Sequence, residues 1–181
     1  MYTTLEALKA FAGLEDESED DLLNALIGSA TDIIEGKTHR KFVVDDETAQ
    51  AFSRVAHVSE RFSGQSLFFY EELAEEASAI TDSPTVIYLP EDGPPYYGVY
   101  ISEGSWAYPT VTVTGYWGYS RVAPPSIEIA CLRLSKWLYD MKDTGNSQMA
   151  IFTPEGQILL PQGLPDDVLT ILKPYIKVVV A

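Results

Sequence analysis

The residues that could take part in metal, acid–base or nucleophilic chemistry are few and lie far apart in the sequence. The two histidines are His39 and His57, and neither has a second histidine or a cysteine at the spacing of a zinc site. The single cysteine, Cys131, falls among apolar residues at helical spacing, which predicts a buried structural thiol rather than a nucleophile. One cysteine cannot form an internal disulfide, so the cysteine content gives no indication of secretion.

The glycines, serines and acidic residues do not form a recognisable catalytic or ligand-binding motif. Gly115 and Gly118 fit neither a phosphate-binding loop nor a dinucleotide fingerprint. No serine has the strand–turn–helix context of a hydrolase nucleophile. The acidic run from Glu15 to Asp21 lacks the glycine and the ligand spacing of a calcium loop. We therefore expect no catalytic residue, no metal site and no cofactor, and a chain that is not an enzyme.

The chain is strongly acidic, and its charge is unevenly distributed. The formal net charge is −15 at pH 7. Residues 1–110 hold 21 acidic and 6 basic side chains, whereas residues 111–181 hold 6 of each. An acidic surface repels nucleic acid, so this composition argues against ordinary DNA or RNA binding. The same charge keeps a free subunit soluble, which is its simplest explanation.

Two helices are predicted in the N-terminal part of the sequence. A short helix covers Thr3–Ala12, where Thr3 and Glu6 fit a capping box and Leu5, Leu8 and Phe11 recur at helical spacing as an apolar stripe. A long helix follows from about Glu19 to Glu35 and is predicted to end at Gly36. Its apolar residues recur at helical spacing and form one stripe: Leu22, Leu23, Leu26, Ile27, Ala30, Ile33 and Ile34.

Two more helices are predicted in the C-terminal part. A second long helix follows the start signal Pro124–Ser126 and stops before Gly145. Its apolar face is predicted to consist of Ile127, Ala130, Cys131, Leu134, Trp137, Leu138 and Met141. A shorter helix is predicted from Pro165 to about Leu172.

Between the two long helices the sequence has the character of strands. Thr85–Leu89, Tyr97–Ser102 and Thr110–Gly115 are β-branched and aromatic, and proline and glycine separate them. The stretch Thr48–Phe62 is ambiguous, with an alternation around Phe52–Val58 that is typical of a strand. Glu71–Ala79 is rich in glutamate and alanine and is compatible with a helical turn or a loop.

These elements predict an α+β fold built on an antiparallel helical core. Two long amphipathic helices and a short N-terminal helix form this core, with a small antiparallel β subdomain inserted and an extended C-terminal tail. The expected organisation is residues 1–44 for the N-terminal helices, 45–120 for the β subdomain, 121–146 for the second core helix and 147–181 for a C-terminal arm with a short helix. The N-terminus lacks a signal-peptide pattern, and no apolar run approaches the ~20 residues that span a bilayer.

Two regions are candidates for contact with a partner. Tyrosine and tryptophan crowd the β region, and these side chains are favoured at interfaces because they bury a large area and keep a polar tip. The candidates are Tyr96, Tyr97, Trp106, Tyr108, Tyr116 and Trp117. The alternative is that they form the core of the β subdomain. The second region is the apolar end of the chain, which is predicted to pack on its own subunit or to pair as a strand with a neighbour: Tyr175, Ile176, Lys177, Val178, Val179, Val180 and Ala181.

Several segments, in this order, resemble bacteriophage head–tail connector (adaptor, or head-completion) proteins of long-tailed phages. The opening Thr3–Lys9, the helix start Asp21–Ile27 and the basic Thr38–Phe42 resemble the beginning of these proteins. The stretch from Val111 to Ser120, followed by the helix that reaches Tyr139, resembles a later signature, and so does the ending Leu164–Tyr175. Residues 45–105 are poorly matched to the family.

The resemblance implies a structural subunit of the virion neck that resides in the host cytoplasm before assembly. It implies a homo-oligomeric ring of twelve copies docked under the portal protein, with a stopper or tail-completion protein below. DNA would pass through the ring without sequence-specific binding, and no membrane is involved. An acidic lumen would let DNA slide because it offers few cations to phosphate. Two other classes remain open, namely a carbohydrate- or receptor-binding module that uses the aromatic strands and an acidic DNA mimic.

Overall fold

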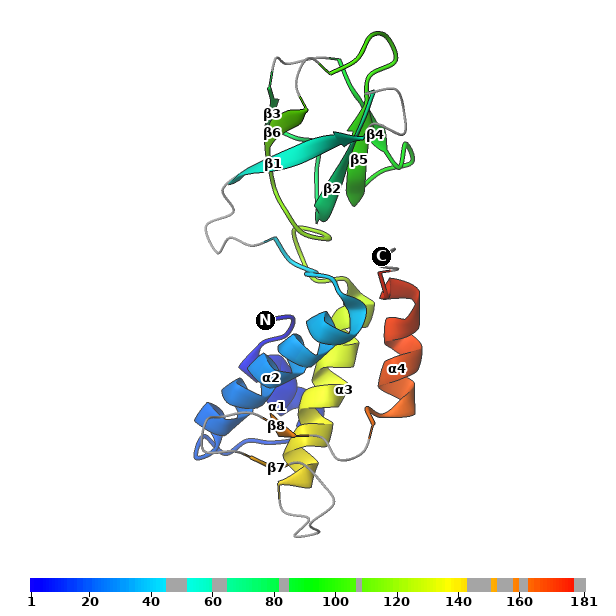
Figure 1. Cartoon of the computed structure of the whole chain (residues 1–181). Helices are drawn as coiled ribbons and strands as arrows, with labels where there is room; N and C mark the ends of the chain where they lie inside the picture. The colour runs from blue at the N-terminus through cyan, green and yellow to red at the C-terminus, as the bar shows by residue number, and fades with distance from the viewer. Residues whose placement is uncertain are drawn as a thin grey trace. The chain divides into compact units, whose positions relative to one another are not determined.

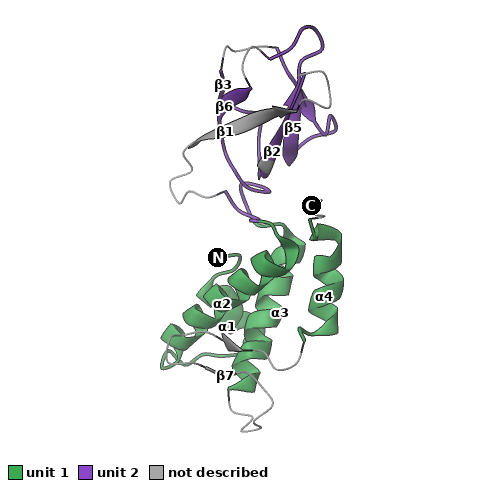
Figure 2. Ribbon diagram, viewed as in Figure 1, with its two compact units in different colours: residues 1–40, 123–181 green, residues 41–122 purple. Residues whose placement is uncertain are grey.

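The computed structural model describes residues 1–44, 52–59, 65–81, 85–106, 109–142, 151–152, 158–159 and 163–177. Two compact units divide the chain, and each has its own core (Figure 2). The helical unit consists of residues 1–40 and 123–181, and the β unit consists of residues 41–122. The β unit is thus inserted into the helical unit, and the chain passes between them twice.

The described part of the helical unit contains four α-helices (Figure 1). These are α1 (Leu5–Ala12), α2 (Asp20–Thr38), α3 (Pro125–Met141) and α4 (Asp166–Leu172), and a 3-10 turn over Lys173–Tyr175 follows α4. Helices α2 and α3 pack against each other along their length, and α1 and α4 both pack on α3. Segments 100 residues apart in sequence meet inside this unit, where the hydroxyl of Thr31 lies 3.9 Å from the sulfur of Cys131.

The core of the helical unit follows the predicted apolar stripes closely. Its fully buried residues are Leu8, Leu23, Leu26, Ile27, Ala30, Ile34, Ile127, Ala130, Cys131, Leu134, Leu138, Val168 and Leu172. Two aromatic residues expected in these stripes lie outside the core. Phe11 is 45% exposed, and Trp137 is half-buried at the edge of the α3 stripe.

The ends of α1 and α2 differ from the sequence prediction by one to three residues. Thr4, and not Thr3, caps α1, because its hydroxyl accepts a hydrogen bond from the Ala7 amide at 3.2 Å. Helix α2 continues past Gly36 to Thr38. The left-handed residue that ends it is His39, at φ 55°, whose amide donates to the Glu35 carbonyl at 2.8 Å.

The β unit is a six-stranded antiparallel sheet with the order β3-β6-β1-β2-β5-β4. The strands are β1 (Phe52–Ser59), β2 (Ser66–Leu73), β3 (Ala79–Ile80), β4 (Ile87–Leu89), β5 (Tyr96–Tyr100) and β6 (Thr110–Gly115). The alternation around Phe52–Val58, which was ambiguous in the sequence, is therefore part of strand β1. The stretch Glu71–Ala79, for which the sequence left a helical turn or a loop open, begins instead as a strand, because Glu71–Leu73 complete β2.

Strand β2 curls so that its far end meets the chain beyond β6. Its pairing with β5 shifts in register between Phe68 and Leu73. Beyond that irregularity Leu73 pairs with Trp117, and the Ala74 amide donates to the Tyr116 carbonyl at 2.8 Å. The sheet thereby wraps around a single core, made of Leu67, Phe69, Leu73, Tyr96, Val99, Val111, Val113 and Trp117. A separate two-stranded sheet joins β7 (Ile151–Phe152) and β8 (Ile158–Leu159).

Candidate interaction surfaces

Two of the aromatic residues proposed for partner contact belong to the core of the β unit. Trp117 is 3% exposed, and its ring meets Phe69 edge-on at 5.4 Å between centroids. Tyr96 is 9% exposed and lies against Tyr88 at 4.8 Å between centroids. Burial raises the pKa of the Tyr88 phenol, whose oxygen accepts a hydrogen bond from the Ala77 amide at 2.9 Å. These rings hold the sheet together, so neither Trp117 nor Tyr96 can act as a sugar-stacking platform.

Among the described residues of this region, Tyr97 and Phe68 are the exposed aromatic ones. Tyr97 is 46% exposed and Phe68 is 37% exposed. Phe68 pairs with Gly98 across β2 and β5, and its ring covers the glycine, since a Cβ at Gly98 would lie 3.1 Å from Phe68 Cδ1. Phe68 and Tyr97 are thus exposed aromatic side chains that the sequence pattern did not separate from the core.

The remaining aromatic candidates are engaged within the β unit. The indole of Trp106 donates a hydrogen bond to the Gln65 carbonyl at 2.9 Å. The guanidinium of Arg121 lies 3.7 Å from the centroid of the Tyr116 ring, and it also pairs with Glu75 at 3.4 Å. Tyr108 lies outside the described residues.

The chain after α4 is anchored to the end of α2. The Arg40 side chain donates to the Tyr175 carbonyl at 2.6 Å, and the Lys177 amide donates to the Thr38 carbonyl at 2.8 Å. Ile176, between these anchors, is 40% exposed. Residues Val178 to Ala181 lie outside the described residues. Hydrogen bonds therefore anchor residues 175–177 to the end of α2 within the subunit, while Ile176 stays exposed.

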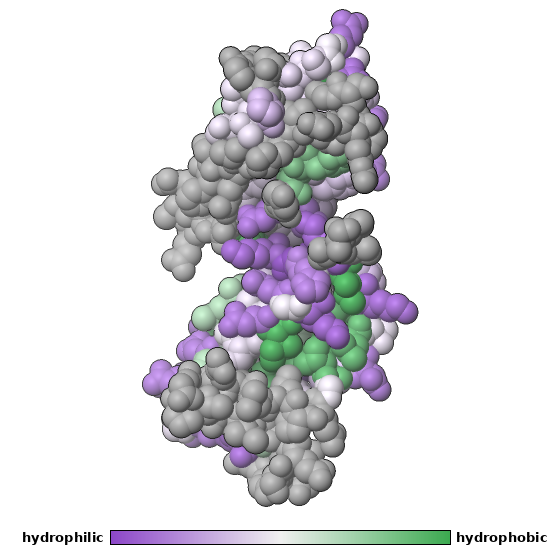
Figure 3. Space-filling view, viewed as in Figure 1, coloured by the Kyte–Doolittle hydropathy of each residue, from purple (hydrophilic) through white to green (hydrophobic). Residues whose placement is uncertain are grey.

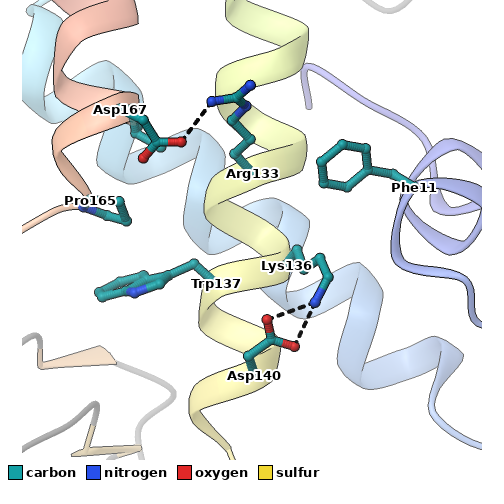
Figure 4. Close-up of a pocket in the computed structure, with 8 residues that line it drawn as sticks. Phe11, Arg133, Lys136, Trp137, Asp140, Pro165 and Asp167 are labelled. Carbon is teal, nitrogen blue, oxygen red and sulfur yellow. Dashed lines mark hydrogen bonds and ion pairs between the residues drawn. The ribbon is translucent and has the colours of Figure 1, made fainter.

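A groove that sequence reasoning missed lies along the exposed side of α3 (Figure 4). It is open to solvent and has a volume of about 330 Å³. Phe11 of α1 and Trp137 lie on opposite sides of α3, and Pro165 and Val168 contribute from the start of α4. The sequence assigned Phe11 and Trp137 to the core stripes, and their positions at the stripe edges were the only signal of exposure.

The charged residues of the groove neutralise one another. Arg133 Nη1 lies 2.7 Å from Asp167 Oδ2, which links α3 to α4. Lys136 Nζ lies 2.7 and 2.9 Å from the two carboxylate oxygens of Asp140, one helical turn further along α3. The hydrogen bond from Arg133 holds the pKa of Asp167 below its ordinary value. The groove therefore combines apolar aromatic side chains with charged side chains whose charges cancel.

The residues first considered for chemistry are placed where they serve structure. Cys131 is buried, and burial raises the pKa of its thiol, so the reactive thiolate is disfavoured. His39 ends α2, and His57 lies in β1 opposite Phe68 and Thr110. Among the described residues, no group of three or more histidine, cysteine or acidic side chains is arranged to hold a metal ion. Within that same part of the chain, no helix combines the length and apolar character needed to cross a bilayer.

Comparison with protein families supports the resemblance seen in the sequence. Residues 2–66 match the model of a family described as phage gp6-like head-tail connector protein. The resemblance is thus confirmed over the N-terminal helices and the beginning of the β unit. None of the curated proteins matches the sequence.

Two solved structures have a similar fold over nearly the whole chain. One is a chain from the neck of an empty GTA particle with sixfold symmetry, at 13% identity and a TM-score of 0.61, covering 98% of this chain and 90% of that chain. The other is from the neck of a native GTA particle with twelvefold symmetry, at 16% identity and a TM-score of 0.53, covering 98% and 92%. At these identities the likeness establishes the fold, which is α+β as the sequence predicted.

Proposed function

We propose that this chain is a structural head–tail connector subunit in the neck of a tailed phage or phage-like particle. Two independent observations carry the proposal, because the family match over residues 2–66 and the whole-chain likeness to neck proteins indicate the same class. The likeness spans both units and nine-tenths of the neck chain, so it does not depend on one shared motif. A connector works through its surfaces and needs no reacting group, which agrees with the structural placement of Cys131 and His39.

The finer proposal is a ring of copies through which DNA passes. The two similar chains come from necks with sixfold and twelvefold symmetry, which favours a ring, and twelve is the number that the sequence resemblance implies. Portal and stopper or tail-completion proteins would be its neighbours, and its location would be the virion neck after a period in the host cytoplasm.

The pairing of cations supports a channel that does not retain DNA. Four basic side chains of the C-terminal half each have a carboxylate partner on the same chain: Arg121 with Glu75, Arg133 with Asp167, Lys136 with Asp140 and Lys142 with Glu19. A cation that is already paired with a carboxylate gains less free energy from binding a DNA phosphate, because it must first lose its contact with that carboxylate. With a net charge of −15, the subunit offers DNA little to bind.

Antibody labelling and mass spectrometry of particles whose genome encodes this chain test the proposal. We expect the chain in complete particles, with the label at the junction of head and tail. A variant genome without this chain is expected to yield filled heads and separate tails. Complete particles that lack the chain would contradict the connector role.

A further inference from the structure

We propose that the groove on α3, formed by Phe11, Trp137 and the ion-paired residues between them, is the binding site for a second copy of this chain. This proposal rests on the connector function and names a surface through which neighbouring copies meet. Unlike the aromatic residues of the β unit, the groove was not among the candidate surfaces in the sequence.

The first argument is the charge of the molecule. Two copies that each have a net charge of −15 repel each other, and this repulsion acts over a Debye length of ~8 Å at physiological salt. Contact between copies is therefore least costly where the surface is locally neutral. In the groove two cations, Arg133 and Lys136, face two carboxylates, Asp140 and Asp167, so their charges cancel.

The second argument is the chemistry of the lining. Aromatic side chains are enriched where proteins meet, whereas unpaired charges are depleted from the centres of interfaces. Phe11 is 45% exposed although it lies on a helix with an apolar stripe, and Trp137, on the other side of α3, is half-buried (Figure 4). Because both ion pairs are closed within the subunit, an incoming copy would not leave a charge without a partner.

The third argument concerns how identical subunits close into a ring. A ring of identical subunits needs a head-to-tail contact, in which the groove of one copy receives a different surface of the next. Other apolar surface is present on the helical unit. On the face shown in Figure 3, apolar residues gather over α3 and α4, and Ile129 and Ile176 of this unit are each 40% exposed. The helical unit therefore has apolar surface for both sides of such a contact.

A photo-cross-linking residue at the groove tests this inference. Phe11 is replaced by p-benzoylphenylalanine in the full chain, which keeps the charge of the groove unchanged, and the matched control carries the same residue at Asn24, an exposed position of α2. Both proteins are irradiated in purified form at millimolar concentration and in assembled particles. We expect the Phe11 variant to form a dimer of this chain, with at least tenfold more product than the Asn24 control.

A second variant separates docking from folding. Trp137→Glu adds a negative charge to the groove and is expected to lower the homodimer yield at least tenfold, with a circular-dichroism spectrum equal to that of the parent. Adducts with a different protein, or no adduct from either preparation, would overturn the inference. A large loss of helical signal in Trp137→Glu would also overturn it, because the groove would then belong to the fold itself. If the particles carry the chain at the neck in any of these cases, the connector function still stands.

Discussion

Arg133 of α3 and Asp167 of α4 form an ion pair at 2.7 Å, and this pair fixes the short C-terminal helix to the middle of the helical unit. The two side chains are 45% and 52% exposed, so water screens their attraction. The pair also forms one edge of the α3 groove. Its contribution to stability is therefore small, and its main effect is on the position of α4 and on the local charge.

The pH dependence of this pair can be predicted in sign. The pKa of Asp167 is lowered in the folded chain, chiefly by the hydrogen bond from Arg133, so its stabilisation is present at neutral pH. It is lost as the pH falls below the range in which an unfolded aspartate titrates, about pH 4. Asp167→Asn should lower the free energy of unfolding by ~0.5 kcal/mol at pH 7. Chemical denaturation should find that difference vanishing toward pH 2, whereas Asp166→Asn, the adjacent control, should change little at either pH.

Loss of the carboxylate partners should create DNA affinity. The triple variant Glu19→Gln, Asp140→Asn, Asp167→Asn leaves Lys142, Lys136 and Arg133 without their carboxylates. We expect this variant to bind duplex DNA at low salt, with log K falling by about 0.9 per tenfold rise in salt for each phosphate contacted. The parent chain should not bind measurably in the same fluorescence-anisotropy titration. Equal binding by both proteins would show that these pairs do not control contact with DNA.

Gly118 is required in the β unit both by its backbone conformation and by a close backbone neighbour. Its φ is 151°, and a Cβ there would lie 2.9 Å from the Val44 backbone nitrogen. Gly118→Ala should therefore destabilise the β unit by about 1–3 kcal/mol. Gly28 in α2 is the matched control, because a Cβ there meets nothing within 4 Å. Gly28→Ala should instead stabilise the helical unit by about 1 kcal/mol, and thermal unfolding of the two variants should shift in opposite directions.

Truncation at the C-terminal end should have two distinct outcomes. Removal of residues 178–181 leaves the Arg40–Tyr175 and Lys177–Thr38 hydrogen bonds in place, so the monomer should unfold at the parent temperature. Removal of residues 175–181 deletes both bonds and should lower the unfolding temperature. If residues 178–181 dock on a neighbour, the shorter truncation should also fail to restore complete particles. Restoration at the parent level would exclude that docking.

The sequence predicted the helical core well because its signal is local and repeated. Leu23, Ile27 and Ile34 recur at helical spacing, and they are buried as that spacing requires. The predicted end of α2 was wrong because Gly36 fits a helix interior as well as a helix end, and the choice of His39 depends on the chain that follows.

The surfaces were harder to predict because exposure depends on contacts between distant segments. Trp117 and Tyr97 are similar in type and lie in neighbouring parts of the β region, yet one is buried and the other is 46% exposed. The register shift in β2 and the pairing of Leu73 with Trp117 decide this, and no local pattern encodes either. The α3 groove was missed for the same reason, since Phe11, Trp137 and Pro165 come from three separate helices or their ends.

Electron cryo-microscopy of the neck, in particles whose genome encodes this chain, tests the central claim most directly. The account predicts a closed ring of copies of this α+β fold between head and tail, with acidic side chains facing the DNA. A neck without this fold would contradict the connector function. A ring whose lumen is lined mainly by Arg121, Arg133, Lys136 and Lys142 would contradict the proposed passage of DNA.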